Sequence, residues 1–280
     1  MFLVKTIKDL QNKLEPYRSF DESIGLVPTM GALHAGHISL VTHALSENTK
    51  VVVSIFVNPT QFNDPKDLER YPRNIDADLK LLGKTGCHIV FVPEVDEVYP
   101  GPDKRKFNFG ELETVMEGKH RPGHFNGVAQ VVSKLFEMVN PDRAYFGLKD
   151  FQQLAIIKSM VKQLEIKVEI VPCPIVREES GLAMSSRNEL LSAEERKNAA
   201  AISETLFRAK ELGNQKSVEG LAEWIEQNIN KNRFLTVEYV AIVDDKKLQP
   251  VKNWNEKNTK VACVAAYCGK VRLIDNIVLN

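Results

Sequence analysis

The chain has 280 residues, 43% of them hydrophobic and 26% charged, as expected for a globular protein of one large domain or two modest ones. Its 37 basic residues balance its 37 acidic ones, so the charge predicts binding neither to nucleic acid nor to an anionic membrane. No apolar run approaches the ~20 residues of a membrane span. The four cysteines form no C-x-x-C pair, so we expect a cytoplasmic protein with reduced thiols.

The first elements indicate a βαβ unit. Residues 6–15 have apolar side chains at helical spacing, and we expect Pro16 to end that helix. Apolar runs at 24–27 and 50–57 are typical of buried parallel strands, and residues 38–45 between them have one apolar helical face. A right-handed crossover is the default for such a unit.

The turn between that strand and helix contains two glycines and two histidines. Gly31 and Gly36 allow a ligand or another segment to approach the backbone closely. The N-terminus of the following helix attracts phosphate. His34 and His37 are three residues apart and share one side of the first helical turn. Three interpretations are open: a nucleotide phosphate site, a purely structural turn, and half of a metal site.

Alternation of strand and helix patterns continues to residue 175, which predicts an α/β fold with a doubly wound, Rossmann-like parallel sheet. In chain order we expect a loop at 64–73, a helix at 74–84, a strand at 88–93, an excursion at 94–126, a helix at 128–139, a strand at 143–146, a helix at 154–164 and a strand at 167–171. Ile75, Leu79 and Leu82 should face the core. Because compact domains seldom contain an excursion of this length without a use, we interpret it as a lid rather than a disordered flap.

The pattern changes near residue 176, where helices are followed by strands. Ser192 and Glu195 form a capping box at the start of a helix. After a polar loop at 177–188, we expect helices at 192–212 and 217–230 and strands at 235–243, 259–268 and 270–278. The sequence therefore predicts two domains, a Rossmann-like one at residues 1–175 and a smaller α+β one at 176–280.

Polar side chains concentrate in four loops that follow strands, and these should converge at the carboxyl edge of the sheet. The loops are Met30 to His37, Asn58 to Gln61, Gly147 to Gln153 and Val176 to Arg187. They are rich in hydrogen-bond donors and cations and poor in nucleophiles. Such a set suits the stabilisation of charge that develops on phosphate oxygens.

Two of these loops resemble known signatures. His34-Ala35-Gly36-His37 is similar to the HIGH signature of the nucleotidyltransferase and class I aminoacyl-tRNA synthetase superfamily, and the segment 184–188 takes the place of its Lys-Met-Ser-Lys-Ser loop. Five blocks together resemble the pantoate–β-alanine ligase family. They lie, in the family's order, at 27–34, 56–62, 124–128, 149–153 and 181–188.

The resemblance implies a reaction. ATP and pantoate would form an enzyme-bound pantoyl adenylate and release pyrophosphate in the presence of Mg²⁺. The amine of β-alanine would then attack the acyl carbon and give pantothenate and AMP. The family also implies a homodimer, and it implies that the domain at 1–175 binds ATP and pantoate while the domain at 176–280 acts as a lid.

The resemblance also implies roles for residues. The catalytic set is His34, His37, Lys149 and Arg187, with His37 as proton donor. Gln61 and Gln153 would bind pantoate, Gln61 would also contact β-alanine, and Asp78 is a candidate neighbour of Mg²⁺. The ATP-binding set is Met30, Gly31, Ala32, Leu33, His34, Ala35, Gly36, His37, Gly147, Leu148, Lys149, Asp150, Val176, Met184, Ser185, Ser186 and Arg187.

One position departs from the family pattern. Leu148 stands where the family usually has Glu, so any contact of that carboxylate is in doubt, although Lys149 and Asp150 follow as usual. Two other functions were weighed. An adenylyltransferase acting on a phosphorylated acceptor should have more basic groups and no paired Gln pocket. A non-catalytic nucleotide sensor should have lost some of the four catalytic residues, and all four are present.

Overall fold

The computed structural model describes residues 1–20 and 22–279, and the chain divides into two compact units. The first unit comprises Met1–Phe109, Arg121–Leu148 and Gln153–Pro174, and the second comprises Gly110–His120, Lys149–Gln152 and Ile175–Asn280. The two short segments of the second unit precede residue 175 in the chain. Contacts over long sequence distances, rather than chain order, therefore define the second unit.

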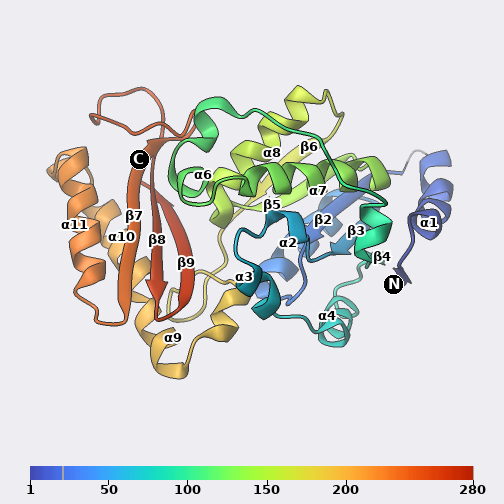
Figure 1. The fold of residues 1–280 in the computed structure, drawn as a ribbon, viewed down its shortest axis with the longest axis horizontal. Coiled ribbons are helices and arrows are strands. Elements are labelled where there is room, and N and C mark those ends of the chain that lie inside the picture. The colour runs from blue at the N-terminus through green and yellow to red at the C-terminus, as the bar shows by residue number, and fades with distance from the viewer. Residues whose placement is uncertain (21, 280) are drawn as a thin grey trace. The chain divides into compact units, whose positions relative to one another are not determined.

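Within the described chain, the first unit contains a six-stranded parallel sheet, which confirms the predicted fold class (Figure 1). The strands lie in the order β1 (Phe2–Val4), β4 (Ile89–Phe91), β3 (Lys50–Ile55), β2 (Ile24–Thr29), β5 (Arg143–Gly147) and β6 (Glu169–Cys173). Val51, Val52 and Val53 of β3 are fully buried, as a strand covered on both faces requires. No local pattern predicts β1, because its three residues are too few to show a period.

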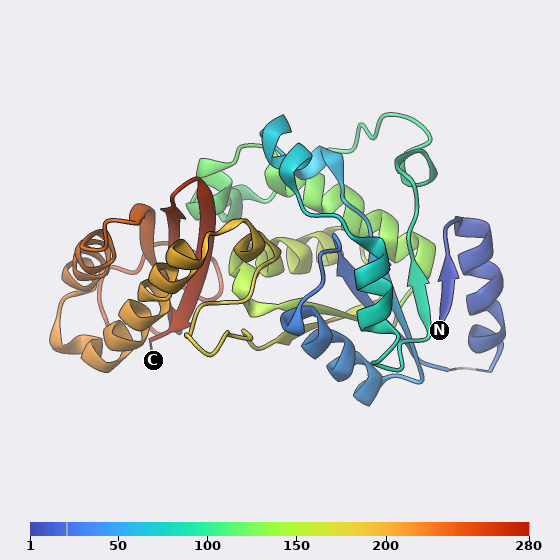
Figure 2. The same cartoon turned by 90° about the horizontal axis from the view of Figure 1, so that it is seen from below.

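Helices cover both faces of this sheet, as right-handed crossovers require (Figures 1 and 2). The helices α2 (Ala35–Glu47) and α4 (Ile75–Leu82) lie on one face, and each connects to a strand nearer to β1. The helices α1 (Ile7–Ser19), α7 (His124–Val139) and α8 (Phe151–Gln163), whose crossovers run the other way, lie on the opposite face. The order of strands reverses between β2 and β5, and in open α/β sheets this switch point is where ligands bind.

Three local predictions in this unit were wrong. Pro16 lies inside α1 instead of ending it, because near the last turn its missing N–H removes only one helical bond. Ile75 is 38% exposed, whereas Asp78 on the same helix is only 3% exposed. The expected loop at 64–73 contains the short helix α3 (Pro65–Arg70), capped by the Asp64 side chain. An Asp-Pro start was a readable helix signal.

The long excursion contains short helical elements rather than continuous loop. In chain order they are α5 (Val95–Val98), η2 (Gly110–Glu113) and α6 (Met116–His120). The excursion is shared between the units, because Gly110–His120 groups with the second. A lid function for it stays a prediction.

The second unit packs helices on a three-stranded antiparallel sheet, as the α+β pattern predicted. The strands are β7 (Leu235–Asp244), β8 (Lys260–Cys268) and β9 (Val271–Val278), with β9 at an edge. The helices are α9 (Ala193–Ala199), α10 (Ala201–Leu212) and α11 (Val218–Asn230). The capping box of Ser192 and Glu195 is confirmed, although the expected single helix is divided at Ala200. Leu206, Leu221 and Ala262 belong to the core between the layers.

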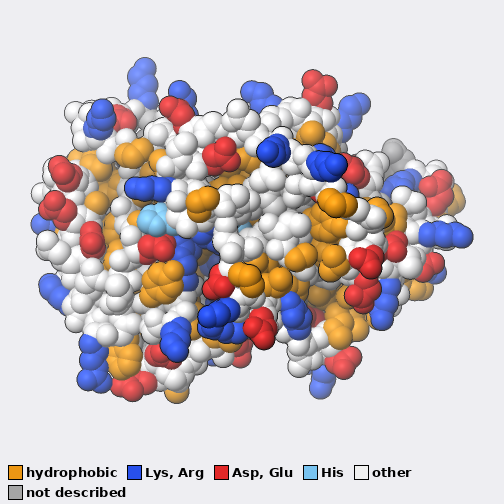
Figure 3. Space-filling model, in the orientation of Figure 1, with side chains coloured by type: hydrophobic (Ala, Val, Ile, Leu, Met, Phe, Trp, Pro, Cys, Tyr) orange, Lys and Arg blue, Asp and Glu red, His pale blue; other side chains and the backbone are white. Residues whose placement is uncertain are grey.

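The surface and the cysteines fit the composition. Basic and acidic side chains are interspersed on the face that Figure 3 shows. The four cysteines are free and buried. Among residues 1–20 and 22–279, no helix combines the length and the apolar character that crossing a membrane needs.

Candidate active site

The histidine-containing turn follows β2 at the switch point of the sheet. After Thr29, the backbone takes left-handed conformations at Gly31 (φ +81°) and Ala32 (φ +50°), and α2 begins at Ala35. A Cβ at Gly31 would approach an Asp78 carboxylate oxygen to 3.0 Å, so glycine suits this position for space as well as for φ. Ala32 is strained there, and a conformation of this kind persists only where the surroundings enforce it.

Asp78 is the group that enforces it. One carboxylate oxygen accepts the N–H of Ala32 at 3.0 Å, and the other accepts the N–H of Leu33 at 2.7 Å. Burial raises the pKa of this carboxyl, while the two backbone hydrogen bonds oppose that rise. Asp78 therefore anchors the turn from α4. A place for Asp78 beside Mg²⁺ stays a prediction that these contacts do not test.

The two histidines cap α2 with the same ring nitrogen. His34 Nδ1 accepts the N–H of Gly36 at 3.1 Å, and His37 Nδ1 accepts the N–H of His34 at 3.3 Å. The ring centroids are 4.1 Å apart. A neutral imidazole that accepts at Nδ1 holds its proton on Nε2. Both rings are thereby fixed as Nε2–H donors at the positive end of a helix.

The pantoate-binding candidate Gln61 lies after β3 in η1 (Pro59–Gln61) and contacts the first loop. Its Nε2 donates to the sulfur of Met30 at 3.0 Å, and its Oε1 accepts from Asn58 at 3.3 Å. Its backbone carbonyl accepts from His124 Nδ1 at 2.7 Å. Met30 and Gln61 were predicted to share a site, and the structure brings them together. Gln153, near the start of α8, is half-buried in the same unit.

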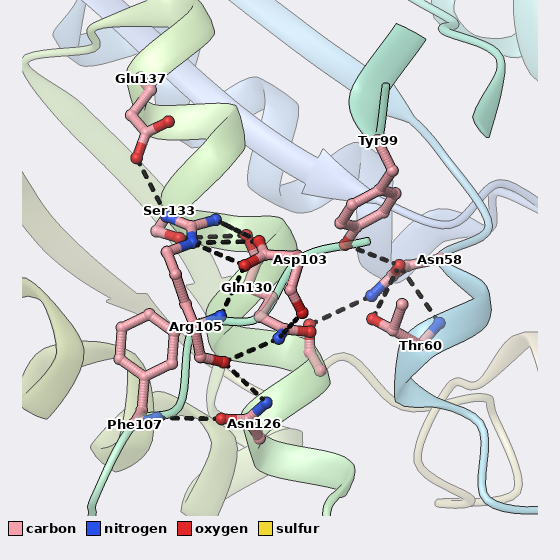
Figure 4. A network of polar contacts seen from close by, with 11 residues as sticks. Asn58, Thr60, Tyr99, Asp103, Arg105, Phe107, Asn126, Gln130, Ser133 and Glu137 are labelled. Atoms are coloured by element: carbon pink, nitrogen blue, oxygen red, sulfur yellow. Dashed lines mark hydrogen bonds and ion pairs between the residues drawn. The ribbon is translucent and has the colours of Figure 1, made fainter. Parts of the chain in front are cut away.

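Asn58 holds the η1 turn in place (Figure 4). Its Nδ2 donates to the carbonyl of Gly127 at 3.1 Å, while its Oδ1 accepts from the Tyr99 hydroxyl at 3.0 Å. A Cβ at Gly127 would lie 2.4 Å from the Thr60 carbonyl oxygen, so α7 can pack on η1 only with glycine there. The position of Gln61 thus depends on α7 as well as on β3.

A second network ties the excursion to α7 (Figure 4). Arg105 forms an ion pair with Asp103 at 2.7 Å and donates to the Gln130 carbonyl at 3.2 Å. Gln130 Nε2 donates in turn to the carbonyls of Asp103 and Arg105. Hydrogen bonds from Arg105 lower the pKa of Asp103 below its usual range.

The other predicted ATP residues lie in the second unit, apart from Gly147 and Leu148, which belong to the first. Lys149 and Asp150, in η3 (Leu148–Asp150), form an ion pair with Nζ 3.1 Å from Oδ1. Val176 and Met184 are brought together, because the N–H of Met184 donates to the Val176 carbonyl at 3.0 Å and closes a small hairpin. Ser185 caps η4 (Ser186–Leu190) by accepting the N–H of Arg187 at 3.2 Å, and Ser186 is buried.

Sequence reasoning missed the side chains that support these loops. The carboxylate of Asp78 was assigned to metal, and Asn58 was noted only as a polar amide near the site. His124 belongs to a block that carries the resemblance, yet the sequence indicates no role for it beyond a charge on the predicted lid. Buried Asn and His beside a predicted site are a usable signal, because buried polar groups need partners.

The whole chain matches one family. The family model described as pantoate-beta-alanine ligase matches residues 2–278.

The chain belongs to the pantoate–β-alanine ligase family.

Relatives in this family cover nearly all of the chain. A pantothenate synthetase of Bacteroides fragilis is 56% identical over 277 residues, which are 99% of this chain and 98% of the relative. One of Phocaeicola vulgatus is 57% identical over 278 residues, which are 99% of each chain. At these levels of identity and coverage, the family assignment extends to the pantoate–β-alanine ligase activity.

Solved structures of the family also match over the full length. Pantothenate synthetase from Thermus thermophilus has a TM-score of 0.93 and 42% identity, covering 100% of this chain and 99% of the other. Pantoate-beta-alanine ligase from Francisella tularensis, complexed with beta-gamma ATP and beta-alanine, has a TM-score of 0.84 and 37% identity. The match covers 100% of this chain and 98% of the other. Both units of this chain therefore have the family's fold.

Proposed function

We propose that this chain carries out the two half-reactions of pantoate–β-alanine ligation, and that the histidine turn, Lys149 and Arg187 contact ATP. This is the reaction of the family to which the chain belongs. In the first, a carboxylate oxygen of pantoate attacks the α-phosphorus of ATP, and pyrophosphate leaves. In the second, the amine of β-alanine attacks the acyl carbon, the amide bond forms, a proton leaves the nitrogen, and AMP departs.

The observation that carries this proposal is the orientation of the two imidazoles. Because both Nδ1 atoms accept backbone N–H groups, both Nε2–H groups are directed as donors from the N-terminus of α2. Preorganised donors of this kind stabilise negative charge that develops on phosphate oxygens. His37 serves as the proton donor that the resemblance implies. An anionic ligand favours its doubly protonated form, and in that form Nδ1 carries a proton, so its contact with the His34 N–H would open. A zinc site would instead need a ring nitrogen of each histidine as a metal ligand.

Lys149 and Arg187 are the cations of the proposal. Lys149 contacts phosphate oxygens as a point charge, and Arg187 does so with its planar fork. The backbone of residues 30–37 and the hairpin residues Val176 and Met184 bind the nucleotide, with Asp150 accepting from ribose hydroxyls. The pairing of Val176 with Met184 and the capping of η4 support a preformed binding surface.

Neutral amides hold pantoate. Gln61 and Gln153 bind its hydroxyls and carboxylate, and Gln61 also contacts β-alanine. An amide donor leaves the carboxylate nucleophilic, whereas an arginine fork would withdraw its charge. The contacts that fix Gln61, from Asn58, Met30 and His124, support this role because a positioning group must itself be held.

Mg²⁺ arrives with ATP in this proposal. The described residues contain no group of three or more His, Cys, Asp or Glu side chains that could hold a metal ion. That fits a metal bound mainly by substrate phosphates and water, as is common for Mg²⁺. Asp78 is the candidate neighbour of Mg²⁺ from the sequence. It also accepts two backbone N–H groups, so it would stabilise the turn as well. The bound ion would neutralise phosphate charge.

The cytoplasmic location and the homodimer implied by the resemblance also belong to the proposal. Four free, buried cysteines are consistent with a reducing compartment.

The test is an incubation of the purified chain with ATP, pantoate and β-alanine. We expect AMP and pantothenate in equal amounts, and no AMP when pantoate is omitted. Formation of ADP, or the absence of turnover from a folded protein, would contradict the proposal. An adenylyltransferase would instead release pyrophosphate with a phosphorylated acceptor.

A further inference from the structure

The edge strand β9 bonds to the segments that contain the predicted cations of the site. Three polar residues near one another on this strand each contact a different segment of the second unit: Arg272, Asp275 and Asn276. Asp275 is 4% exposed and Asn276 is 6% exposed. Buried polar groups are normally hydrogen-bonded, so the partners of these three residues indicate which segments the strand positions.

Asn276 holds the segment of Lys149. Its Nδ2 donates to the backbone carbonyl of Lys149 at 3.0 Å across 127 residues of chain. The contact is to the backbone, so it fixes the backbone position of Lys149 and does not occupy the ammonium group of its side chain. That ammonium group lies 3.1 Å from Asp150, its neighbour in the same short segment.

Asp275, the preceding residue, holds the segment of Arg187. Its two oxygens accept from both terminal nitrogens of Arg177, at 2.6 and 3.0 Å. Arg177 pairs with Ala183 across the small hairpin and donates to the Gly181 carbonyl. The hairpin leads directly into η4, which contains Arg187. A bidentate, buried pair of this type is geometrically strict.

Arg272 secures the Lys149 segment from its other end. The guanidinium donates to both oxygens of Glu117, at 2.8 and 2.7 Å, and Tyr239 donates to the same carboxylate at 2.9 Å. The N–H of Glu117 donates to Gln152 Oε1 at 2.9 Å, and Gln152 Nε2 donates to the carbonyls of Leu112 and Val115. Lys149–Gln152 is therefore fixed at Lys149 by Asn276 and at Gln152 by the segment that Arg272 holds.

We propose that β9 fixes the positions of the Lys149 segment and the Arg187 segment within the second unit. The two cations would then contact the triphosphate as one preformed pair. Asn276 is the positioning residue for Lys149, and Asp275 with Arg177 positions the loop of Arg187. Asp275 and Asn276 are consecutive residues of β9, so their side chains project from opposite faces of the sheet while their backbones belong to one rigid strand. This inference rests on the proposed function, in which Lys149 contacts phosphate.

A double-mutant cycle on ATP binding tests the role of Asn276. The variants are Asn276→Ala, Lys149→Ala and both together, and the measurement is the affinity for ATP by titration calorimetry without pantoate. We expect Asn276→Ala alone to weaken ATP binding about tenfold, since small displacements of a positioned group are costly. In the Lys149→Ala background the same change should cost little, because Asn276 acts through Lys149.

The matched control is Asn228→Ala. Asn228 donates from Nδ2 to the Trp224 carbonyl in α11, so it makes the same kind of contact in the same unit. It should leave ATP affinity unchanged in both backgrounds. If Asn276→Ala does not fold, as judged by thermal unfolding, Asn276→Leu removes the same donor with a similar shape and no added charge, and it completes the cycle.

Equal losses from Asn276→Ala in both backgrounds, or no loss in either, would overturn the inference. Because the readout is ATP affinity, it can support or overturn the role of β9 even if the three-substrate incubation yields no pantothenate. Failure of the proposed function and failure of the positioning role are thus separate results.

Discussion

Single residues determine what the site can do, and His37 is the clearest case. Its Nδ1 is used by the backbone of His34, so its chemistry is confined to Nε2. We expect His37→Ala to fold normally and to lose ~10²-fold or more in the rate of adenylation, the scale of acid–base and electrostatic groups. The measurement is pyrophosphate release with ATP and pantoate.

The control for this prediction is His43→Ala. His43 lies later in α2, more than a third exposed, and contacts Glu47 at the surface. It should keep the wild-type rate. If His37→Ala released pyrophosphate at that rate too, the assignment of the proton donor would be wrong.

At the scale of elements, the packing of α7 on η1 should govern Gln61. The change Gly127→Ala would place a methyl group 2.4 Å from the Thr60 carbonyl, so α7 and η1 must separate. We expect a loss of about 1–3 kcal/mol in the free energy of unfolding and a higher KM for pantoate. Gly101→Ala is the control, because a Cβ at Gly101 meets nothing within 4 Å. Equal behaviour of the two variants in denaturant titrations would refute the packing argument.

The Asp103–Arg105 pair should make stability depend on pH. Hydrogen bonds from Arg105 lower the pKa of Asp103 in the folded chain. The stabilisation is therefore complete above the ordinary Asp pKa of about 4, and it is lost as the pH falls through the lowered value. We expect Asp103→Asn to cost about 1–2 kcal/mol at pH 7 and progressively less below pH 4. A cost that stays constant down to pH 2, in urea titrations compared with the exposed Asp96→Asn, would contradict this.

Much of the architecture was predictable from local patterns, because buried parallel strands such as β3 are continuous apolar runs and α7 has a strong apolar face. Short elements were not. The strand β1 has three residues, and its pairing with β4 is a contact across 87 positions that no local pattern records. Ile75 is exposed although its spacing predicted a core position, and Asp78 is buried because its carboxylate accepts the backbone N–H groups of a distant turn.

The candidate site was predictable as a set of residues but not as an arrangement. Motif resemblance selected His34, Gln61, Lys149 and Arg187. It could not show that the imidazoles cap their own helix, since Nδ1 acceptance depends on backbone geometry. Nor could it assign Lys149 to the second unit, because the contact from Asn276 spans 127 residues.

For the whole molecule, the proposed homodimer can be tested by its mass. Sedimentation velocity should give a species of about twice the 31.6 kDa chain mass, with no change on a tenfold dilution in the micromolar range. A species of the single-chain mass alone would contradict the homodimer and leave the chemistry of the site as argued.

The central claim is that the pantoate carboxylate becomes an acyl adenylate, and isotope transfer tests this most directly. In that mechanism the attacking carboxylate oxygen forms the bond to the α-phosphorus and leaves with AMP when β-alanine attacks the acyl carbon. With pantoate labelled by ¹⁸O at both carboxylate oxygens, mass spectrometry should find one ¹⁸O in each AMP. Unlabelled AMP, or label in inorganic phosphate released together with ADP, would contradict the account.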